Sequence, residues 1–265
     1  MIPSAPPIRS TVDANGVDLI TDTFNLSSRD VSIGPSGSDG LTFVRSFFGT
    51  GWTDNTIATI TVSGSVYTVS FGGGSETFSL SGGTYFSQQG SGSTLTYNSG
   101  TGIYTYTTSG YVIVQFATSL GTITATPYAN AARPTSATYP DGHVVTYTYQ
   151  TVSVCNPTCP GAMVSASRLQ SVNNNNGYQL KLTYSSNTAS AVADLVAWSR
   201  IATVTGINNA VDYCDPTANS CSGFTITWPS ATYAVTTGPP ATSTVTDALS
   251  RVTRYTYDAV GHITG

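Results

Sequence analysis

Apolar and hydroxyl-bearing residues alternate along much of this 265-residue chain, and Gly- or Asn-rich segments interrupt the alternation about every eight to twelve residues. Residues 57–127 show the pattern most clearly, as in the run IATITVSGSVYTVSF. Because successive side chains of a strand point to opposite faces, this alternation predicts strands with one packed and one wet face. Only residues 189–199 (ASAVADLVAWS) fit either a short helix or a loop. We therefore predict an all-β fold of antiparallel sheets.

The composition agrees with this fold class and limits the partners. Charged residues make up 8% of the chain, against roughly 25% in ordinary soluble domains. There is one lysine, Lys181, and one glutamate, Glu76, whereas Thr, Ser, Tyr and Val are frequent, which favours sheets over helices. The net charge of −4 and the lack of Lys/Arg clusters argue against nucleic acid as a partner. The sequence has no apolar run long enough to predict a transmembrane segment.

The four cysteines form two local pairs, Cys155 with Cys159 in CNPTC and Cys214 with Cys221 in CDPTANSC. Both segments are rich in turn-forming residues, which favours a disulfide within each surface loop. A four-cysteine zinc site is a less favoured alternative because neither spacing is C-x2-C, and free thiols are the other alternative. Disulfides predict a secreted or cell-surface protein, and no signal peptide is visible in the sequence.

A loose internal repeat begins after the sequence pattern changes near residues 131–134. We therefore place a boundary between an N-terminal β-rich domain, 1–134, and a repeat domain, 135–265. Each copy has a β run, a polar turn and a second run that ends in Tyr. The copies span residues 138–149, 168–184, 200–213 (the most degenerate) and 243–265. A hairpin of this size cannot bury its own apolar face, so the copies are expected to join in a continuous sheet.

The last copy contains the segment RYTYDAVGHIT, with Tyr255, Tyr257, Asp258, Gly261 and His262 at characteristic positions. It resembles the YD repeat of the RHS-repeat family, which runs aromatic-x-Tyr-Asp, two residues, Gly, a basic residue, an aliphatic residue and Thr. Here His262 stands where Arg is usual. In this motif Asp258 is expected to accept turn amides and Gly261 to supply a positive φ. The ring of Tyr257 is expected to pack in the sheet with its hydroxyl in water.

The resemblance extends weakly toward the N-terminus, through the segments Gly16–Leu19, Asp30–Gly34 and Leu41–Ser46. Proteins of the family it resembles wind such hairpins into a hollow β shell, often around a C-terminal toxin in bacteria, and animal relatives act in cell adhesion. The resemblance thus implies a non-enzymatic scaffold segment of an exported protein. It further implies an N-terminal piece of a longer chain or a short member, with further repeats or a toxin domain as partners.

The residues that could carry catalysis have simpler interpretations. His143 and His262 each follow a turn glycine, and no G-x-S-x-G motif accompanies them, so both are expected as surface residues of turns. Glu76 lies in a predicted hairpin and most aspartates lie in turns, which does not favour the paired carboxylates of a glycosidase. We predict no catalytic residue, no cofactor and no metal site.

The alternative function is a carbohydrate-binding or adhesive surface module. Exposed aromatic rings among Ser, Thr and Asn suit sugar recognition, because the rings stack on sugars while hydroxyls and amides hydrogen-bond to them. The candidate stacking residues are Trp52, Trp198 and Trp228. The competing interpretation is that these tryptophans fill the core.

Overall fold

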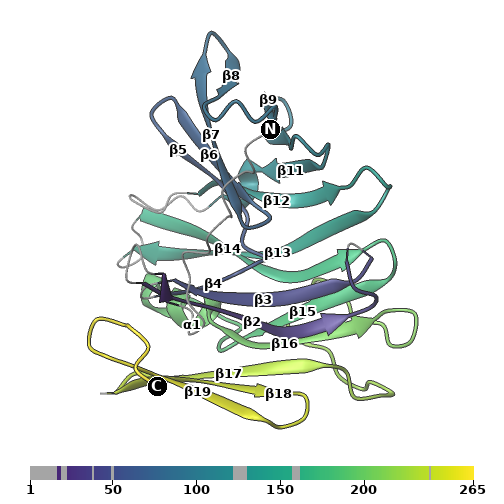
Figure 1. Ribbon diagram of the computed structural model, residues 1–265, viewed down its shortest axis with the longest axis vertical. Coiled ribbons are helices and arrows are strands. Elements are labelled where there is room, and N and C mark those ends of the chain that lie inside the picture. The colour runs from purple at the N-terminus through teal and green to yellow at the C-terminus, as the bar shows by residue number, and fades with distance from the viewer. Residues whose placement is uncertain are drawn as a thin grey trace, which may run out of the picture.

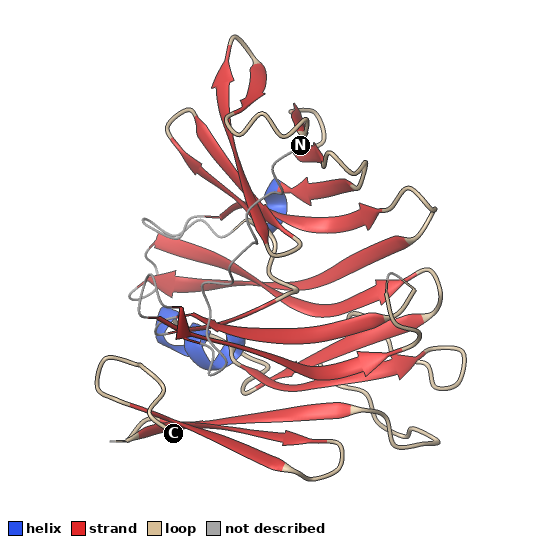
Figure 2. Ribbon diagram, in the orientation of Figure 1, coloured by secondary structure: helices blue, strands red, loops and turns tan. Residues whose placement is uncertain are grey.

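The computed structural model describes residues 17–18, 23–37, 39–48, 51–121, 130–156, 162–238 and 240–265, and strands with their connecting turns dominate them (Figure 2). The one α-helix of these residues, α1 (Leu195–Ser199), follows the 3-10 turn η2 (Val192–Asp194), within the segment that fitted either helix or loop. A second 3-10 turn, η1, spans Thr118–Leu120. The prediction of an antiparallel all-β fold is confirmed.

The first four strands form a separate antiparallel sheet, which we call the N-terminal sheet. Its strands are β1 (Val17–Asp18), β2 (Thr23–Ile33), β3 (Leu41–Phe48) and β4 (Gly51–Asp54), in that order. Burial alternates along β3, so that Leu41, Phe43, Arg45 and Phe47 share its buried face. The presence of an arginine in this apolar series is central to the candidate site.

The remaining strands belong to one branched sheet of fifteen strands, the long sheet. Its order is β19-β18-β17-β16-β15-β14-β13-β12-β5-β6-β7-β8, and β11, which carries β10 and β9, also pairs with β12. The strands of its first part are β5 (Thr59–Ser63), β6 (Val66–Phe71), β7 (Gly74–Ser81), β8 (Thr84–Ser87), β9 (Thr94–Asn98), β10 (Ile103–Thr107) and β11 (Ile113–Ala117). Those of its second part are β12 (Asn130–Thr138), β13 (Val144–Asn156), β14 (Ala162–Asn174), β15 (Tyr178–Tyr184), β16 (Ile201–Asn208), β17 (Ser230–Thr236), β18 (Ala241–Asp247) and β19 (Val252–Tyr257).

Strands β12 to β19 lie side by side in sequence order, each antiparallel to the next. Three expected repeat copies are hairpins of this array, namely the β12–β13, β14–β15 and β18–β19 pairs. The copy at 200–213 contributes only β16. Beyond it the chain leaves the sheet, because the buried carboxylate of Asp212 accepts hydrogen bonds from Thr225 (Oγ1, 2.9 Å) and Trp228 (Nε1, 2.8 Å) and so holds a loop together.

The expected boundary between residues 134 and 135 falls inside strand β12. The first part of this strand pairs with β5, most of its length pairs with β11, and its last residues pair with β13. Pro134 lies opposite Phe116, and Ser136 lies opposite Thr146. The ranges 1–134 and 135–265 therefore share one hydrogen-bonded sheet at this point.

The N-terminal sheet packs against the C-terminal part of the long sheet, with β2 and β3 lying over β15, β16 and β17 (Figure 1). Phe43, Leu180, Leu182 and Val204 are buried members of the core that the two sheets share. The sheets approach closely at Gly206 of β16, where an added Cβ would lie 2.9 Å from Cβ of Ile33. Segments far apart in the sequence thus form one core.

Two arms of the long sheet, β5–β8 and β9–β11, meet through aromatic side chains. Tyr67 and Tyr85 contact Tyr104, with ring centroids 6.0 and 6.3 Å apart, and Phe78 contacts Tyr106 edge-on at 6.0 Å. Buried beside these rings is the chain's one glutamate. Its carboxylate accepts hydrogen bonds from the hydroxyls of Tyr106 (3.0 Å), Ser87 (2.8 Å) and Ser91.

The Glu76 carboxylate is expected to stabilise this part of the fold. Burial disfavours its charged form, but the hydroxyl donors outweigh burial, and the pKa of Glu76 lies below its ordinary value. Glu76→Gln should lower the free energy of unfolding at neutral pH by about 1–3 kcal/mol. Because the folded pKa is depressed, the stability from the charged form is present above the unfolded pKa and is lost as pH falls through the folded pKa. Urea unfolding should therefore show the difference at pH 7 shrinking in acid, whereas a difference independent of pH would contradict this role.

Candidate functional site

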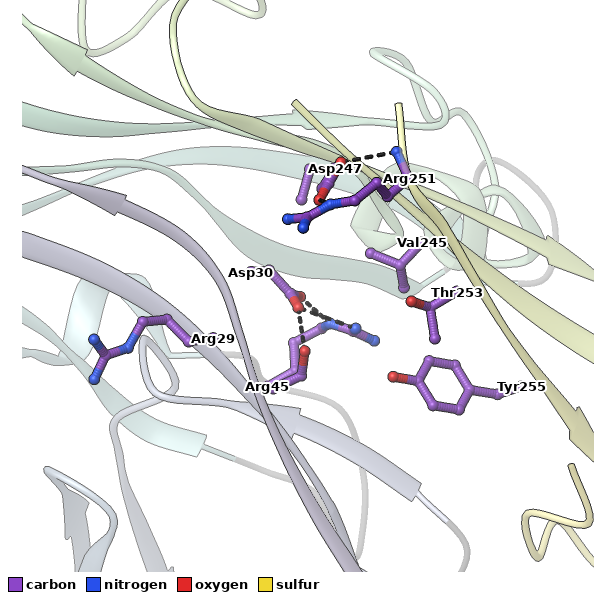
Figure 3. Close-up of a pocket in the computed structure, with 10 residues that line it drawn as sticks. Arg29, Asp30, Arg45, Val245, Asp247, Arg251, Thr253 and Tyr255 are labelled. Carbon is purple, nitrogen blue, oxygen red and sulfur yellow. Dashed lines mark hydrogen bonds and ion pairs between the residues drawn. The ribbon is translucent and has the colours of Figure 1, made fainter. Parts of the chain in front are cut away.

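A cleft of about 410 Å³ lies between the N-terminal sheet and the terminal hairpins of the long sheet (Figure 3). Residues of β2 and β3 form one wall, and residues of β17 to β19 and the β18–β19 turn form the other. The lining residues are Ser28, Arg29, Asp30, Arg45, Ala231, Val245, Asp247, Arg251, Thr253 and Tyr255. Half of them (Val245, Asp247, Arg251, Thr253 and Tyr255) belong to the last repeat copy, 243–265, which contains the segment that resembles the YD repeat. This cleft is therefore the candidate functional site.

The first wall contains a buried ion pair between Arg45 of β3 and Asp30 of β2. Their side chains are only 11% and 3% exposed, and the guanidinium contacts the carboxylate through both Nε and Nη2. The carboxylate also accepts hydrogen bonds from the hydroxyls of Tyr233 (2.8 Å) and Ser28 (2.7 Å). Burial and this carboxylate raise the pKa of Tyr233, which keeps its hydroxyl protonated as a donor. Both oxygens of Asp30 and the Nε and Nη2 of Arg45 are therefore hydrogen-bonded, as buried charges require.

Aromatic rings from both sheets surround the guanidinium of Arg45. Its Cζ lies 4.2 Å from the ring centroid of Trp52 (β4) and 4.9 Å from that of Tyr233 (β17). Trp52 also contacts Tyr255 edge-on at 5.0 Å and donates a hydrogen bond from Nε1 to the hydroxyl of Tyr257 (2.7 Å). A cation between aromatic faces gains electrostatic attraction from both rings. We call the rings of Trp52, Tyr233, Tyr255 and Tyr257 the aromatic seam.

The seam changes the expected environment of Tyr257. Its ring packs as expected, tilted against Phe47 at 6.3 Å. Its hydroxyl, expected in water, instead contacts Trp52 Nε1 and the hydroxyl of Ser243. The difference arises because the N-terminal sheet covers the face that carries the tyrosines, which could not be foreseen from the hairpin alone.

The opposite wall holds an exposed ion pair between Arg251 and Asp247, with Nε and Oδ2 2.7 Å apart. Amides of the turn, that of Arg251 foremost, outweigh burial and lower the pKa of Asp247. Both carboxylates that line the cleft thus bind arginine side chains. Neither carboxyl group is therefore free, as that of a general acid or base must be to exchange a proton with a substrate.

The YD-like segment contains a five-residue turn, Asp258–His262. The N–H of Asp258 donates to the carbonyl of His262 (3.0 Å), and the N–H of Gly261 donates to the carbonyl of Asp258 (3.2 Å). Oδ1 of Asp258 accepts the amides of Val260 (3.0 Å) and His262 (2.9 Å), and Gly261 has a φ of 97°. Asp258 and Gly261 thus play the turn-forming roles expected from the sequence.

The same turn recurs at three other hairpins. In each, a side-chain oxygen of the first residue accepts the amide of the fifth, and the fourth residue has a positive φ. The turns are Thr108–Val112 (3.0 Å; Tyr111 φ 62°), Asn174–Tyr178 (2.9 Å; Gly177 φ 86°) and Asp247–Arg251 (2.9 Å; Ser250 φ 60°). Thr, Asn and Asp all supply the acceptor, so different residue types form the same turn geometry.

The three candidate sugar-stacking tryptophans lie apart. Trp198 is 2% exposed beneath Arg168, whose Cζ is 4.5 Å from its ring centroid, and Trp228 is 9% exposed. Neither ring has a face open to a sugar, because protein atoms cover both. Trp52 keeps part of its surface exposed, but the aromatic seam uses its ring and its N–H.

One of the expected disulfides is present, between Cys214 and Cys221. It closes a loop that covers Lys181, whose Nζ donates to the carbonyls of Pro216 (2.9 Å) and Asp215 (3.3 Å). Burial lowers the pKa of Lys181 to about 8. The other expected pair, Cys155 and Cys159, cannot be traced in full because Cys159 lies outside the described residues.

The two histidines differ in their surroundings. His262 is exposed, and its Nδ1 lies 3.0 Å from Asp258 Oδ2. His143, expected at the surface, is only 5% exposed. His143 directly precedes β13. Residues of the N-terminal sheet and of the turn between β6 and β7 lie around it and account for the burial of its side chain.

Sequence reasoning missed Arg45, Asp30 and Tyr233, which form the centre of the site. One signal for Arg45 was present in the segment LTFVRSFF. Period-two alternation places Arg45 on the same face as Phe43 and Phe47, and an arginine that points into a core requires a partner. The identity of that partner depends on strand pairing and sheet packing, which the sequence pattern does not specify.

Comparison of the sequence with models of known protein families and with curated proteins gave no match. Among the described residues, no helix is long and apolar enough to span a membrane. The same residues contain no group of three or more His, Cys, Asp or Glu side chains that could hold a metal ion.

We expect the buried ion pair to contribute strongly to stability. Asp30→Asn leaves the Arg45 guanidinium buried without its carboxylate, and the free energy of unfolding should fall by about 3–5 kcal/mol. Asp247→Asn is the matched control, since it breaks an exposed Asp–Arg pair and should cost much less. Urea denaturation measures both, and equal losses would contradict the importance of the buried pair.

The shared turn geometry predicts effects of opposite sign at one turn position. Ser250 and Gly261 both have positive φ, which is unfavourable for residues with a Cβ by roughly 1–2 kcal/mol. Ser250→Gly should therefore raise the free energy of unfolding, by less than this because glycine gains entropy in the unfolded chain, and Gly261→Ala should lower it. Chemical denaturation of both variants tests this, and a change of the same sign in both would show that the turns are not equivalent.

Proposed function

We propose that this chain is a non-enzymatic scaffold segment of an exported RHS/YD-repeat protein, of the kind that builds a β shell around a toxin or makes contact at a cell surface. The lateral array from β12 to β19 supports the proposal, because each hairpin gains its core from its neighbours. The N-terminal sheet supports it as well, since it covers the tyrosine-bearing face of the last hairpins through Trp52 and Arg45.

The observation that carries the proposal is the pairing beyond the last YD turn. After Asp258–His262 the chain returns along β19, where the N–H of Thr256 donates to the carbonyl of Gly265 (2.6 Å) and the N–H of Thr264 donates to the carbonyl of Thr256 (2.8 Å). Tyr257 and Ile263 form an antiparallel bridge. The segment after the turn thus pairs with β19 through an isolated bridge, and pairing of this kind is how a shell grows by adding hairpins.

Export is supported by the Cys214–Cys221 disulfide, because such bonds persist in oxidising compartments. The loop that the disulfide closes would be an accessible epitope on an exported protein. An antibody raised against residues 209–229 can therefore test both parts of the proposal in the organism that encodes the chain.

We expect this antibody to detect a polypeptide longer than 265 residues in the medium or on intact cells. Unless the protein is first reduced, Cys214 and Cys221 should not react with an alkylating reagent, because they are joined in a disulfide. A cytoplasmic enzyme, followed in the same fractions, controls for leakage from broken cells. A signal confined to the cytoplasm, with reduced cysteines, would contradict the proposed export and scaffold role.

A further inference from the structure

A second hollow, separate from the cleft of Figure 3, is lined in part by His143, the buried histidine of the β12–β13 turn. The backbone of His143 is fully used, because its N–H donates to Asp141 Oδ1 (2.9 Å) and its carbonyl accepts the N–H of Tyr139 (2.8 Å). Its side chain is different. Neither Nδ1 nor Nε2 has a hydrogen-bond partner among the described residues, although the residue is only 5% exposed. Buried polar groups are normally satisfied, so both ring nitrogens call for a partner beyond the described residues.

The hollow has a volume of about 320 Å³, at the small end of the range for small-molecule sites. The N-terminal sheet contributes Thr42 and the β4–β5 connection contributes Asn55, while Phe71 comes from the end of β6. Tyr139 and Tyr147 flank His143 on the long sheet, and the rings of Tyr139 and His143 lie 5.6 Å apart. Three parts of the chain that are distant in sequence thus meet around one imidazole.

The lining selects for an uncharged ligand. The described residues that line the hollow include no Asp, Glu, Lys or Arg, so a charged group would lose its hydration without gaining a counter-ion. The amide of Asn55 is already used, because Nδ2 donates to the carbonyl of Thr42 (2.8 Å) and Oδ1 accepts the N–H of Val44 (2.9 Å). Polar recognition therefore rests on the imidazole of His143, beside which Tyr139 and Tyr147 contribute hydroxyls to the lining.

The chemistry of the imidazole ring narrows the ligand further. Its nitrogens donate or accept a hydrogen bond according to tautomer and protonation, so the best partners are groups that can also do both, and hydroxyls are such groups. The aromatic rings of Phe71, Tyr139 and Tyr147 provide faces that pack well against the C–H surface of a ring compound. A ring with several hydroxyls and an apolar C–H face meets both requirements.

We propose that this hollow binds one neutral pyranose sugar, either free or as the terminal unit of a glycan, with the His143 imidazole hydrogen-bonded to its hydroxyls. This site goes beyond a scaffold role and uses none of the three tryptophans. It would give the chain a means to contact a polysaccharide or a glycosylated surface.

The direct test follows the histidine side chains of the unaltered protein by NMR. Glucose, galactose, mannose and N-acetylglucosamine are added in turn, with glucuronate as the charged comparison. We expect at least one neutral sugar to shift the ring nitrogens of His143 in a saturable way while those of exposed His262 stay unchanged. No saturable shift with any neutral sugar, equal shifts at both histidines, or preference for glucuronate would overturn the proposal.

Two matched variants give an independent readout by saturation-transfer NMR. His143→Phe keeps a flat ring but removes both nitrogens, and the affinity for the sugar should fall at least about tenfold, the equivalent of one lost hydrogen bond. His262→Phe changes the corresponding position of a similar turn and should leave the affinity unchanged. Unaltered affinity in His143→Phe would contradict the proposal. Thermal unfolding without sugar should show that His143→Phe is folded and no less stable, since it removes unsatisfied buried groups.

A binding comparison distinguishes a free sugar from the terminal unit of a glycan as the ligand. Terminal glycans displayed on a surface are tested beside the free monosaccharide that binds best. Tighter binding to the displayed glycan assigns the site to a polymer or glycosylated surface, and equal binding assigns it to the free sugar. Glycerol that binds as well as the sugars would show that the hollow has no preference for a sugar ring and would overturn the proposal.

Discussion

The buried ion pair between Arg45 and Asp30 is the constraint on which the arrangement of the two sheets depends. Arg45 lies on the buried face of β3 between Phe43 and Phe47, so its charge must be met inside the protein. Asp30 supplies the opposite charge, and Tyr233 of the long sheet supplies a hydroxyl to Asp30 and a ring face to Arg45. The ion pair therefore gains this further hydrogen bond and ring contact only when the N-terminal sheet lies against β17.

This constraint gives the tyrosines of the YD-like hairpins a structural purpose. In an isolated hairpin, Tyr255 and Tyr257 would expose much of their ring surface. Across from Trp52 they instead complete the aromatic seam, and the hydroxyl of Tyr257 accepts the indole N–H. The repeated turn fixes which residues of each hairpin face inward, since a one-residue shift in register would turn the tyrosines to the other face. Local turn chemistry and sheet packing thus specify the same arrangement.

The sequence predicted features that are local in the chain. Alternation predicted the strands, the motif residues Asp258 and Gly261 predicted the turn, and the spacing of Cys214 and Cys221 predicted a disulfide that the structure contains. These predictions succeed because their physical causes lie within about ten residues. The partners of Arg45 and the burial of His143 depend on contacts between segments more than a dozen residues apart, and no periodic pattern encodes them.

The repeat at 200–213 shows how a local pattern can mislead. Its apolar residues fit a second hairpin strand, yet Val211 and Tyr213 are exposed in a loop. The buried carboxylate of Asp212 and the Cys214–Cys221 disulfide hold that loop over the outer side of β14 and β15. Side-chain hydrogen bonds and a covalent link here outweigh strand propensity, which is a weak and context-dependent preference.

Native-state hydrogen exchange tests most directly whether the two sheets are one cooperative unit joined at Arg45. If they are, the backbone amides of β2 and β3 and those of β17 to β19 should exchange with the same free energy of opening, and Asp30→Asn should lower it equally in both groups. Exchange of β17 to β19 at a much lower free energy, unaffected by Asp30→Asn, would show that the terminal hairpins fold without the N-terminal sheet and would contradict this account.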